Sequence, residues 1–259
     1  MKQENFYSSS NKSSTLKKPN GFTLVEIAIV MILAGLIIGG IFGGIKLIDN
    51  SNAQKAAKDL KAIESAALTF KTIYKALPGD IQNPATEIPN CATAPCSRSG
   101  DGNGNIGSLV SIQGEALVVT SEKFTMWSHL KAADLIDEVA NVDDMEFGAG
   151  QMASPLGGGY RLNQFMQGNP IAVGSPYSPW GHSMNITNVP FDIVNAGNAA
   201  NHLFIPCSLI EFIDKKIDDS LPRFGKLITN ITCMSNTADH MSAYGNPTNL
   251  GSPLYIFNF

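Results

Sequence analysis

The residues best suited to chemistry in this chain are oxygen side chains in one short glycine-rich run. Asp101, Asn103 and Asn105 alternate with glycines, and flexible turns of this kind let side-chain and carbonyl oxygens converge on a calcium ion. The twelfth position of such a loop, which is acidic in an EF-hand, is Ile112 here. The run therefore predicts either a calcium site that is not an EF-hand or a solvated Asp/Asn-Gly turn.

Four cysteines could form disulfide bonds. Cys91 and Cys96 lie five residues apart, and Cys207 and Cys233 lie far downstream. An even number of cysteines in an exported domain indicates disulfides. Of the three possible pairings we favour Cys91–Cys96 with Cys207–Cys233, and four free buried thiols are the alternative. Zinc is disfavoured, because there is no C-x-x-C pair in the sequence.

No catalytic constellation is evident in the sequence. Motifs for serine hydrolases and zinc peptidases are missing, and the four histidines are scattered. The carboxylates of Asp214, Asp218 and Asp219 are clustered, but helical spacing predicts that Asp214 and Asp218 share a solvated face. The net charge of −4 offers no basic surface for nucleic acid. The sequence therefore predicts neither an enzyme nor a nucleic-acid-binding protein.

One apolar segment is long enough to anchor the rest of the chain in a membrane. Ile27–Ile45 comprises 19 residues without a charge, about the length that crosses a bilayer as a helix. A secretory signal peptide has a shorter apolar core. This uncharged segment is one reason why only 15% of the residues in the chain are charged. Soluble domains typically contain about 25% charged residues. It predicts a single transmembrane helix.

Beyond Lys46 the apolar residues recur at spacings of three and four, which predicts a helix with one buried stripe. The polar residues Asp59 and Glu64 lie off this stripe, and Pro78-Gly79 predicts its end. The stripe consists of Ala53, Ala56, Leu60, Ile63, Ala67, Phe70, Tyr74 and Leu77. We therefore expect one helix over residues 22–77, transmembrane over 22–45 and then amphipathic.

Residues 78–259 are expected to form an α+β globular domain in which the long helix packs on a small antiparallel β-sheet with extra short helices. Proline and glycine crowd residues 78–108, where regular structure is not expected. Alternation and turn signals predict helices over 124–139 and 209–219, and strands over 160–166, 171–173, 182–187, 226–232 and 254–259.

The residues before the apolar run carry a resemblance to a known family. Gly21-Phe22-Thr23-Leu24-Val25-Glu26, followed by the apolar run, resembles the cleavage and methylation motif of type IV pilins and type II secretion pseudopilins. The resemblance implies that a prepilin peptidase/N-methyltransferase cuts between Gly21 and Phe22 and methylates Phe22. Residues 1–21 would then be a cleaved leader. Four lysines against Glu4 give this leader a net charge of +3, which leaves −7 for the rest.

In this family the glutamate at the position of Glu26 is thought to pair with the terminal amine of a neighbouring subunit. The resemblance therefore implies a structural subunit of a type II secretion pseudopilus or a type IV pilus. Its partners would be the peptidase, the inner membrane and other subunits, which it would contact through the N-terminal helix. The globular domain would lie in the periplasm. The chain is longer than the usual major subunits, which favours a minor subunit.

Two alternatives remain open on the sequence. The protein could be a membrane-tethered periplasmic binding domain, or it could be a tip adhesin. Residues 147–191, whose only charge is Arg161, are the place to look for an adhesive surface.

Overall fold

The computed structural model describes residues 22–107, 121–165, 181–188, 203–222, 224–229, 231–236, 243–251 and 253–257. The chain divides into two compact units, Met1–Ile45 and Lys46–Phe259, and each is described by itself. The strand predicted over 171–173 lies outside the described residues.

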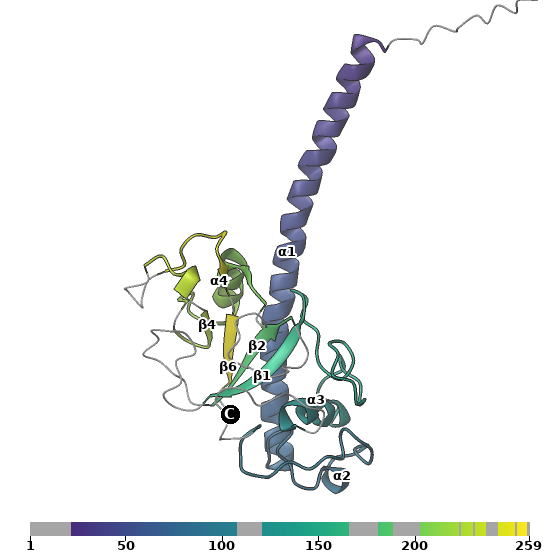
Figure 1. Cartoon of the computed structure of the whole chain (residues 1–259), viewed down its shortest axis with the longest axis vertical. Coiled ribbons are helices and arrows are strands. Elements are labelled where there is room, and N and C mark those ends of the chain that lie inside the picture. Colours follow the sequence, from purple (N-terminus) through teal and green to yellow (C-terminus); the bar gives the residue numbers. More distant parts are fainter. Residues whose placement is uncertain are drawn as a thin grey trace, which may run out of the picture. The chain divides into compact units, whose positions relative to one another are not determined.

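The α1 helix spans Leu24–Tyr74, 51 residues, so the boundary between the two units falls within it (Figure 1). The first of its buried residues is Ala53. The helix ends three residues before the predicted Leu77, because Lys75 adopts a left-handed conformation with a φ of 60°. The N–H of Lys75 still donates to the carbonyl of Lys71 at 3.0 Å. A left-handed residue therefore ends the helix before Pro78 is reached.

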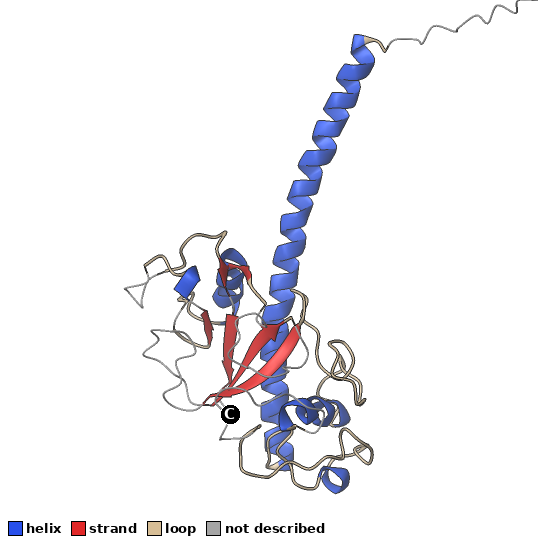
Figure 2. Cartoon of the chain, viewed as in Figure 1, coloured by secondary structure: helices blue, strands red, loops and turns tan. Residues whose placement is uncertain are grey.

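The second unit contains a four-stranded antiparallel sheet with the strand order β1-β2-β6-β4 (Figure 2). The sheet places the C-terminal strand β6 between β2 and β4, a position that the order of the strands in the sequence does not reveal. A separate two-stranded sheet pairs β3 with β5. The bounds are β1 Gly159–Phe165, β2 Gly181–Thr187, β3 Ile205–Pro206, β4 Leu227–Thr229, β5 Leu250–Gly251 and β6 Pro253–Phe257.

Short helices accompany the sheet. The α3 helix ends at Ala132, seven residues before the predicted end at Val139, because Asp134 takes a positive φ of 54°. The four-residue α2 helix and the short strands β3 and β5 are not predicted by the sequence. The helices are α2 Pro84–Glu87, α3 Glu122–Ala132, α4 Cys207–Ile217 and the 3-10 helix η2 Ile231–Cys233. The architecture confirms the predicted α+β class, a long helix on a small antiparallel sheet with extra short helices.

The core of the second unit forms where the apolar stripe of α1 joins the side chains of the sheet and of α3. Ala53, Leu60 and Phe70 of the stripe are buried, as the periodicity predicts. They join a single apolar cluster that also contains Trp127, Leu130, Tyr160, Leu162, Met184, Ile186, Leu227 and Tyr255.

Asp59 and Glu64 contradict the expectation that the polar residues of α1 lie off the buried face. Each is only 8% exposed. The Tyr160 hydroxyl donates to Asp59 Oδ2 at 3.2 Å, and the Tyr255 hydroxyl donates to Glu64 Oε2 at 2.7 Å. Lys226 Nζ pairs with Glu64 Oε1 at 2.7 Å. Buried carboxylates need such partners, so these contacts set the rotation and register of α1 against β1, β6 and β4.

Candidate functional site

The N-terminus of α1 is closed by reciprocal hydrogen bonds between Thr23 and Glu26. The backbone N–H and the hydroxyl of Thr23 donate to Glu26 Oε2 at 2.8 and 2.9 Å, and the Glu26 N–H donates to Thr23 Oγ1 at 3.2 Å. This is a capping box, in which two backbone donors at the helix start are satisfied. This role of Thr23 was not among the predictions from the sequence, although the Thr-x-x-Glu spacing is a signal for it.

The predicted processing residues lie just before this cap. Phe22 is exposed and precedes the helix, and Gly21 lies outside the described residues. The cleavage and methylation expected between Gly21 and Phe22 would therefore create a new N-terminus one residue from the capping box. Glu26 would then be the acidic residue closest in sequence to that terminus.

The first half of α1 has an apolar surface that covers no other described residue of its own unit. Its large side chains are mostly more than half exposed, for example Leu36 at 69% and Phe42 at 66%. Within the described part of the chain, α1 is the one helix long and apolar enough to cross a membrane. An uncovered apolar surface of this length needs lipid or other apolar helices around it.

Five glycines interrupt this surface without being required by packing inside the chain. A methyl group built at any of them would meet nothing within 4 Å among the described residues, and the helix runs through them unbroken. Their small size is therefore not explained by a contact with the described residues of the chain. The set is Gly35, Gly39, Gly40, Gly43 and Gly44.

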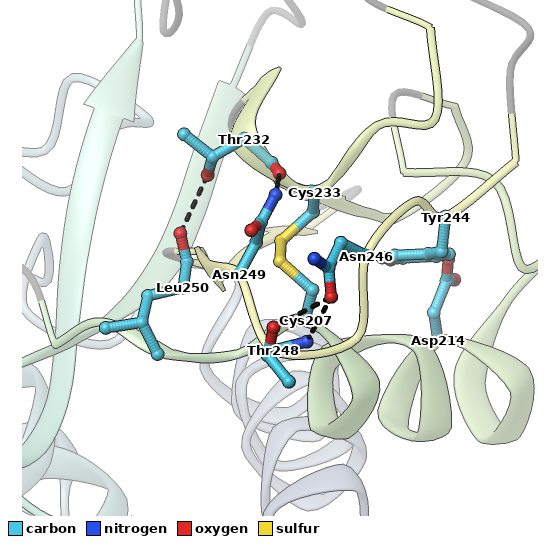
Figure 3. The surroundings of a disulfide bond; sticks show 9 residues. All are labelled: Cys207, Asp214, Thr232, Cys233, Tyr244, Asn246, Thr248, Asn249 and Leu250. Carbon is cyan, nitrogen blue, oxygen red and sulfur yellow. Dashed lines mark hydrogen bonds between the residues drawn. A yellow bond between two sulfur atoms is a disulfide. The ribbon is translucent and has the colours of Figure 1, made fainter.

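Both pairs of cysteines are bonded in the structure. Cys91 joins Cys96, and Cys207 at the start of α4 joins Cys233 at the end of η2. Figure 3 shows the second bond beside the segment that enters β5, where the Asn249 amide donates to the carbonyl of Thr232 at 2.8 Å. The disulfide therefore fastens the start of α4 to η2, 26 residues away in the sequence, and the Asn249 hydrogen bond joins η2 to the segment that enters β5.

Removing the Cys207–Cys233 bond should lower stability more than removing Cys91–Cys96. The two bonds close loops of 26 and 5 residues, and in the chain-entropy description loops of these lengths correspond to about 3.5 and 2 kcal/mol. We expect the paired Cys→Ser variants to follow this order in urea unfolding of the detergent-solubilised protein. The reverse order would contradict it.

His129 joins two loops inside the second unit. It is fully buried. Its Nδ1 accepts the Gly79 N–H at 2.8 Å, so the proton of the neutral ring lies on Nε2, which donates to the Cys96 carbonyl at 2.8 Å. Burial lowers the pKa of His129 to about 4, against the opposing effect of the Cys96 carbonyl. Protonation of Nδ1 would place its hydrogen against that of the Gly79 N–H, and the hydrogen bond between them would be lost.

Acidification should therefore destabilise the fold through His129. Its pKa is lower in the folded chain than the ordinary 6.5, so the unfolded chain binds more protons between these values and stability falls as the pH drops through them. From pH 7.5 to 5 the loss should be about 2 kcal/mol. Urea unfolding of the wild type and His129→Gln at both pH values measures it. The variant should lose correspondingly less stability, and an equal pH dependence would refute this assignment.

The predicted calcium run forms a turn whose oxygens accept backbone hydrogen bonds. Asp101 Oδ1 accepts the N–H of Asn103 at 3.0 Å, and Asn103 Oδ1 accepts the N–H of Asn105 at 2.8 Å. The carboxylate of Asp80 accepts the N–H groups of Asn103 and Gly104, both at 2.9 Å. These are the contacts of an Asx turn held by a buried carboxylate.

A second carboxylate also holds this turn. Glu122 accepts the N–H of Asp101 at 2.8 Å and that of Gly107 at 2.6 Å. Oxygens of Asp80, Asp101 and Glu122 lie within 4.8 Å of one another, and burial raises the pKa of both Asp80 and Glu122. Asp80 and Glu122 were not predicted from the sequence, since only the folded chain brings them to the turn. Calcium at Asp101, Asn103 and Asn105 remains a prediction.

The acidic group at the end of α4 differs from its predicted arrangement. Asp214 is completely buried, although helical spacing predicts it on a solvated face with Asp218. The reason is tertiary, because Asp214 faces Tyr244, whose hydroxyl donates to it at 3.0 Å.

Comparison with known families identifies one motif. The family model described as the prokaryotic N-terminal methylation motif matches residues 16–42, which include Gly21, Phe22, the capping box and most of the apolar run. No curated protein and no solved structure matches the chain. The match confirms the resemblance on the residues that carry it. An apolar N-terminal helix with this motif fits membrane anchoring, and the chain carries the N-terminal signature of type IV pilins and pseudopilins.

Proposed function

We propose that this protein is a pilin-like structural subunit. A prepilin peptidase cuts between Gly21 and Phe22 and methylates Phe22. The mature chain then enters a type IV pilus or a type II secretion pseudopilus as a minor subunit. The observation that carries this proposal is the methylation motif at the start of a helix whose apolar surface is not covered by any described part of the chain.

The same helix serves two environments in this proposal. Before assembly its apolar half lies in the inner membrane, and after assembly it lies among the helices of neighbouring subunits. The membrane and the fibre interior are both apolar, so the exposed apolar side chains of the first half of α1 are covered in either environment. The glycines that packing inside the chain does not require would let neighbouring helices approach closely.

The second unit is the exported part of the subunit in this proposal. Its two disulfide bonds support a location in an oxidising compartment such as the periplasm. The subunits of this family are structural rather than enzymatic.

The proposal is tested by following an epitope-tagged chain in cells that contain prepilin peptidase. We expect mass spectrometry to find a mature chain that starts at methylated Phe22, and immunogold labelling to find it in sheared fibres at a small fraction of the major subunit. A mature chain confined to membranes, without fibre partners on cross-linking, would favour a tethered binding domain. Deletion strains distinguish the systems, since loss of protein secretion indicates a pseudopilus and loss of surface fibres a pilus.

A further inference from the structure

The peptide between Asn103 and Gly104 joins two groups that can react with each other. Asparagine is a thermolabile residue, because the backbone nitrogen of the next residue can attack its side-chain carbonyl carbon and close a five-membered ring. Glycine has no Cβ to obstruct this attack. The sequence contains two Asn-Gly pairs, Asn20-Gly21 and Asn103-Gly104. Only the second lies outside residues 1–21, the expected leader.

Both reacting residues are open to water. Asn103 and Gly104 are exposed, and a Cβ built at Gly104 would meet nothing within 4 Å among the described residues. Gly104 has a φ of +82°, a left-handed conformation that favours glycine. The turn therefore favours glycine at this position through its backbone conformation, and it leaves the reacting atoms accessible to water.

The Asx turn folds the side chain of Asn103 back along this peptide. Asn103 Oδ1 accepts the N–H of Asn105 at 2.8 Å, which is the peptide N–H that follows Gly104. The side chain is therefore held toward the Gly104 nitrogen, and a reactant held near its partner reacts faster than a freely moving one. The same N–H of Asn105 would stabilise the negative charge that develops on Oδ1 during the attack.

A carboxylate contacts the attacking nitrogen. Asp80 Oδ2 accepts the N–H of Gly104 at 2.9 Å, and Asp80 Oδ1 accepts the N–H of Asn103 at 2.9 Å. Asp80 is buried, so these bonds hold its carboxylate in one place against the turn. A general base must lie within hydrogen-bond reach of the proton that it removes, and Asp80 meets this condition for the proton of Gly104.

A second carboxylate contacts the leaving group. Asn103 Nδ2 donates to Asp101 Oδ2 at 2.6 Å. Oxygens of Asp80 and Asp101 lie within 4.8 Å of one another. The proton removed from Gly104 therefore has a short path from Asp80, past Asp101, to the nitrogen that departs.

We propose that Asn103 is a site of spontaneous deamidation that the folded chain accelerates, with Asp80 as the general base. The Gly104 nitrogen loses its proton to Asp80 and forms a bond to Cγ of Asn103. The bond from Cγ to Nδ2 breaks, the proton passes to Nδ2, and ammonia leaves a succinimide. Water then opens either C–N bond of the succinimide ring. The net reaction consumes one water, releases one ammonia and gives aspartate or isoaspartate at position 103.

The product should loosen the turn that made it. A new carboxylate at position 103 lies beside Asp80 and Asp101, and it lacks the Nδ2 donor that Asp101 accepts in the unmodified chain. Isoaspartate also lengthens the backbone by one methylene group, which displaces the N–H groups that Asp80 holds. Deamidation would therefore mark old molecules by a change of charge and of loop conformation.

The test compares the same chain folded and unfolded. The full-length protein in detergent is incubated at neutral pH with a chelator, which keeps cations from the predicted calcium residues, with or without guanidinium chloride. Mass spectrometry of digests measures deamidation at each asparagine, and isoaspartyl methyltransferase measures isoaspartate. We expect Asn103 to deamidate at least about fivefold faster in the folded chain. A folded chain that keeps Asn103, or that reacts no faster than the unfolded chain, overturns the proposal.

Asn105 is a control within the same turn. The residue after it is Ile106, whose β-branched side chain crowds the nitrogen that would attack. Asn105 should therefore stay intact while Asn103 reacts. Equal reaction at both asparagines would contradict a mechanism specific to the Asn103–Gly104 peptide.

Two matched variants test the role of Asp80. Asp80→Asn and Glu122→Gln each replace a carboxylate that accepts two N–H groups of the turn by an amide with one acceptor oxygen. Only Asp80 contacts the Gly104 nitrogen. In the folded chain Asp80→Asn should slow deamidation at least about tenfold, and Glu122→Gln should leave the rate nearly unchanged. A folded Asp80→Asn chain that reacts as fast as the wild type refutes the base. If this variant does not fold, the wild-type comparison still decides whether the fold accelerates the reaction.

Discussion

Replacing Gly21 by valine is expected to leave the chain uncleaved, with all 259 residues and no methylated Phe22. The peptidase must accept the residue before the cut in its active site, and a branched side chain there fills space that glycine leaves open. Because the methyl group is added to the new N-terminus, one substitution should abolish both modifications. Intact-mass spectrometry of the membrane fraction measures the result, and cleaved product should fall at least about 100-fold, a barrier increase of about 2.7 kcal/mol.

A matched variant separates this effect from general damage to the leader. Asn20→Val introduces the same side chain one residue earlier and should still be processed. Both variants should insert into the membrane, since the apolar run is unchanged. If the Gly21→Val chain starts at Phe22, the cleavage site assigned here is wrong. If the wild-type chain keeps Met1 in cells with active peptidase, the proposed function fails with it.

Glu26→Gln is expected to permit cleavage but to reduce incorporation into fibres at least about tenfold. A carboxylate within the apolar segment costs several kcal/mol unless it is paired, and the resemblance implies pairing with the terminal amine of a neighbouring subunit. Glutamine removes the charge and hence this pairing. Quantitative immunoblots of sheared fibres against the membrane fraction measure the change.

The capping box allows a sharper version of this experiment. Glutamine can replace glutamate in a capping box, so Glu26→Gln keeps the cap and removes only the charge. Thr23→Val does the reverse, because it removes the hydroxyl that both donates to and accepts from Glu26. Loss of a helix N-cap lowers the stability of the helix by about 1 kcal/mol. If Thr23→Val abolishes incorporation while Glu26→Gln does not, Glu26 acts as a helix cap rather than as the partner of an amine.

Local patterns in the sequence predicted the elements that depend on local physics. The apolar run predicted the first half of α1, because a segment of that length and composition is suited to a bilayer whatever the rest of the chain does. The three-and-four spacing predicted the buried stripe of the second half, and alternation predicted β1 and β2. The ends of elements were less accurate, since Lys75 and Asp134 end helices through left-handed conformations. The type of Lys75 does not signal this, and aspartate is enriched in such conformations without requiring them.

The sequence by itself was sufficient to identify the motif Gly21-Phe22-Thr23-Leu24-Val25-Glu26 and to predict the apolar helix that follows. Both depend only on the order of neighbouring residues and not on contacts between distant segments. The tertiary structure decided which charged groups are buried. Asp59, Glu64 and Asp214 look like surface residues on their helices. Their burial is tolerable because the hydroxyls of Tyr160, Tyr255 and Tyr244 contact them, and Glu64 also pairs with Lys226. A buried charge requires a partner, and a helical pattern contains no information about partners that lie 30 to 191 residues away.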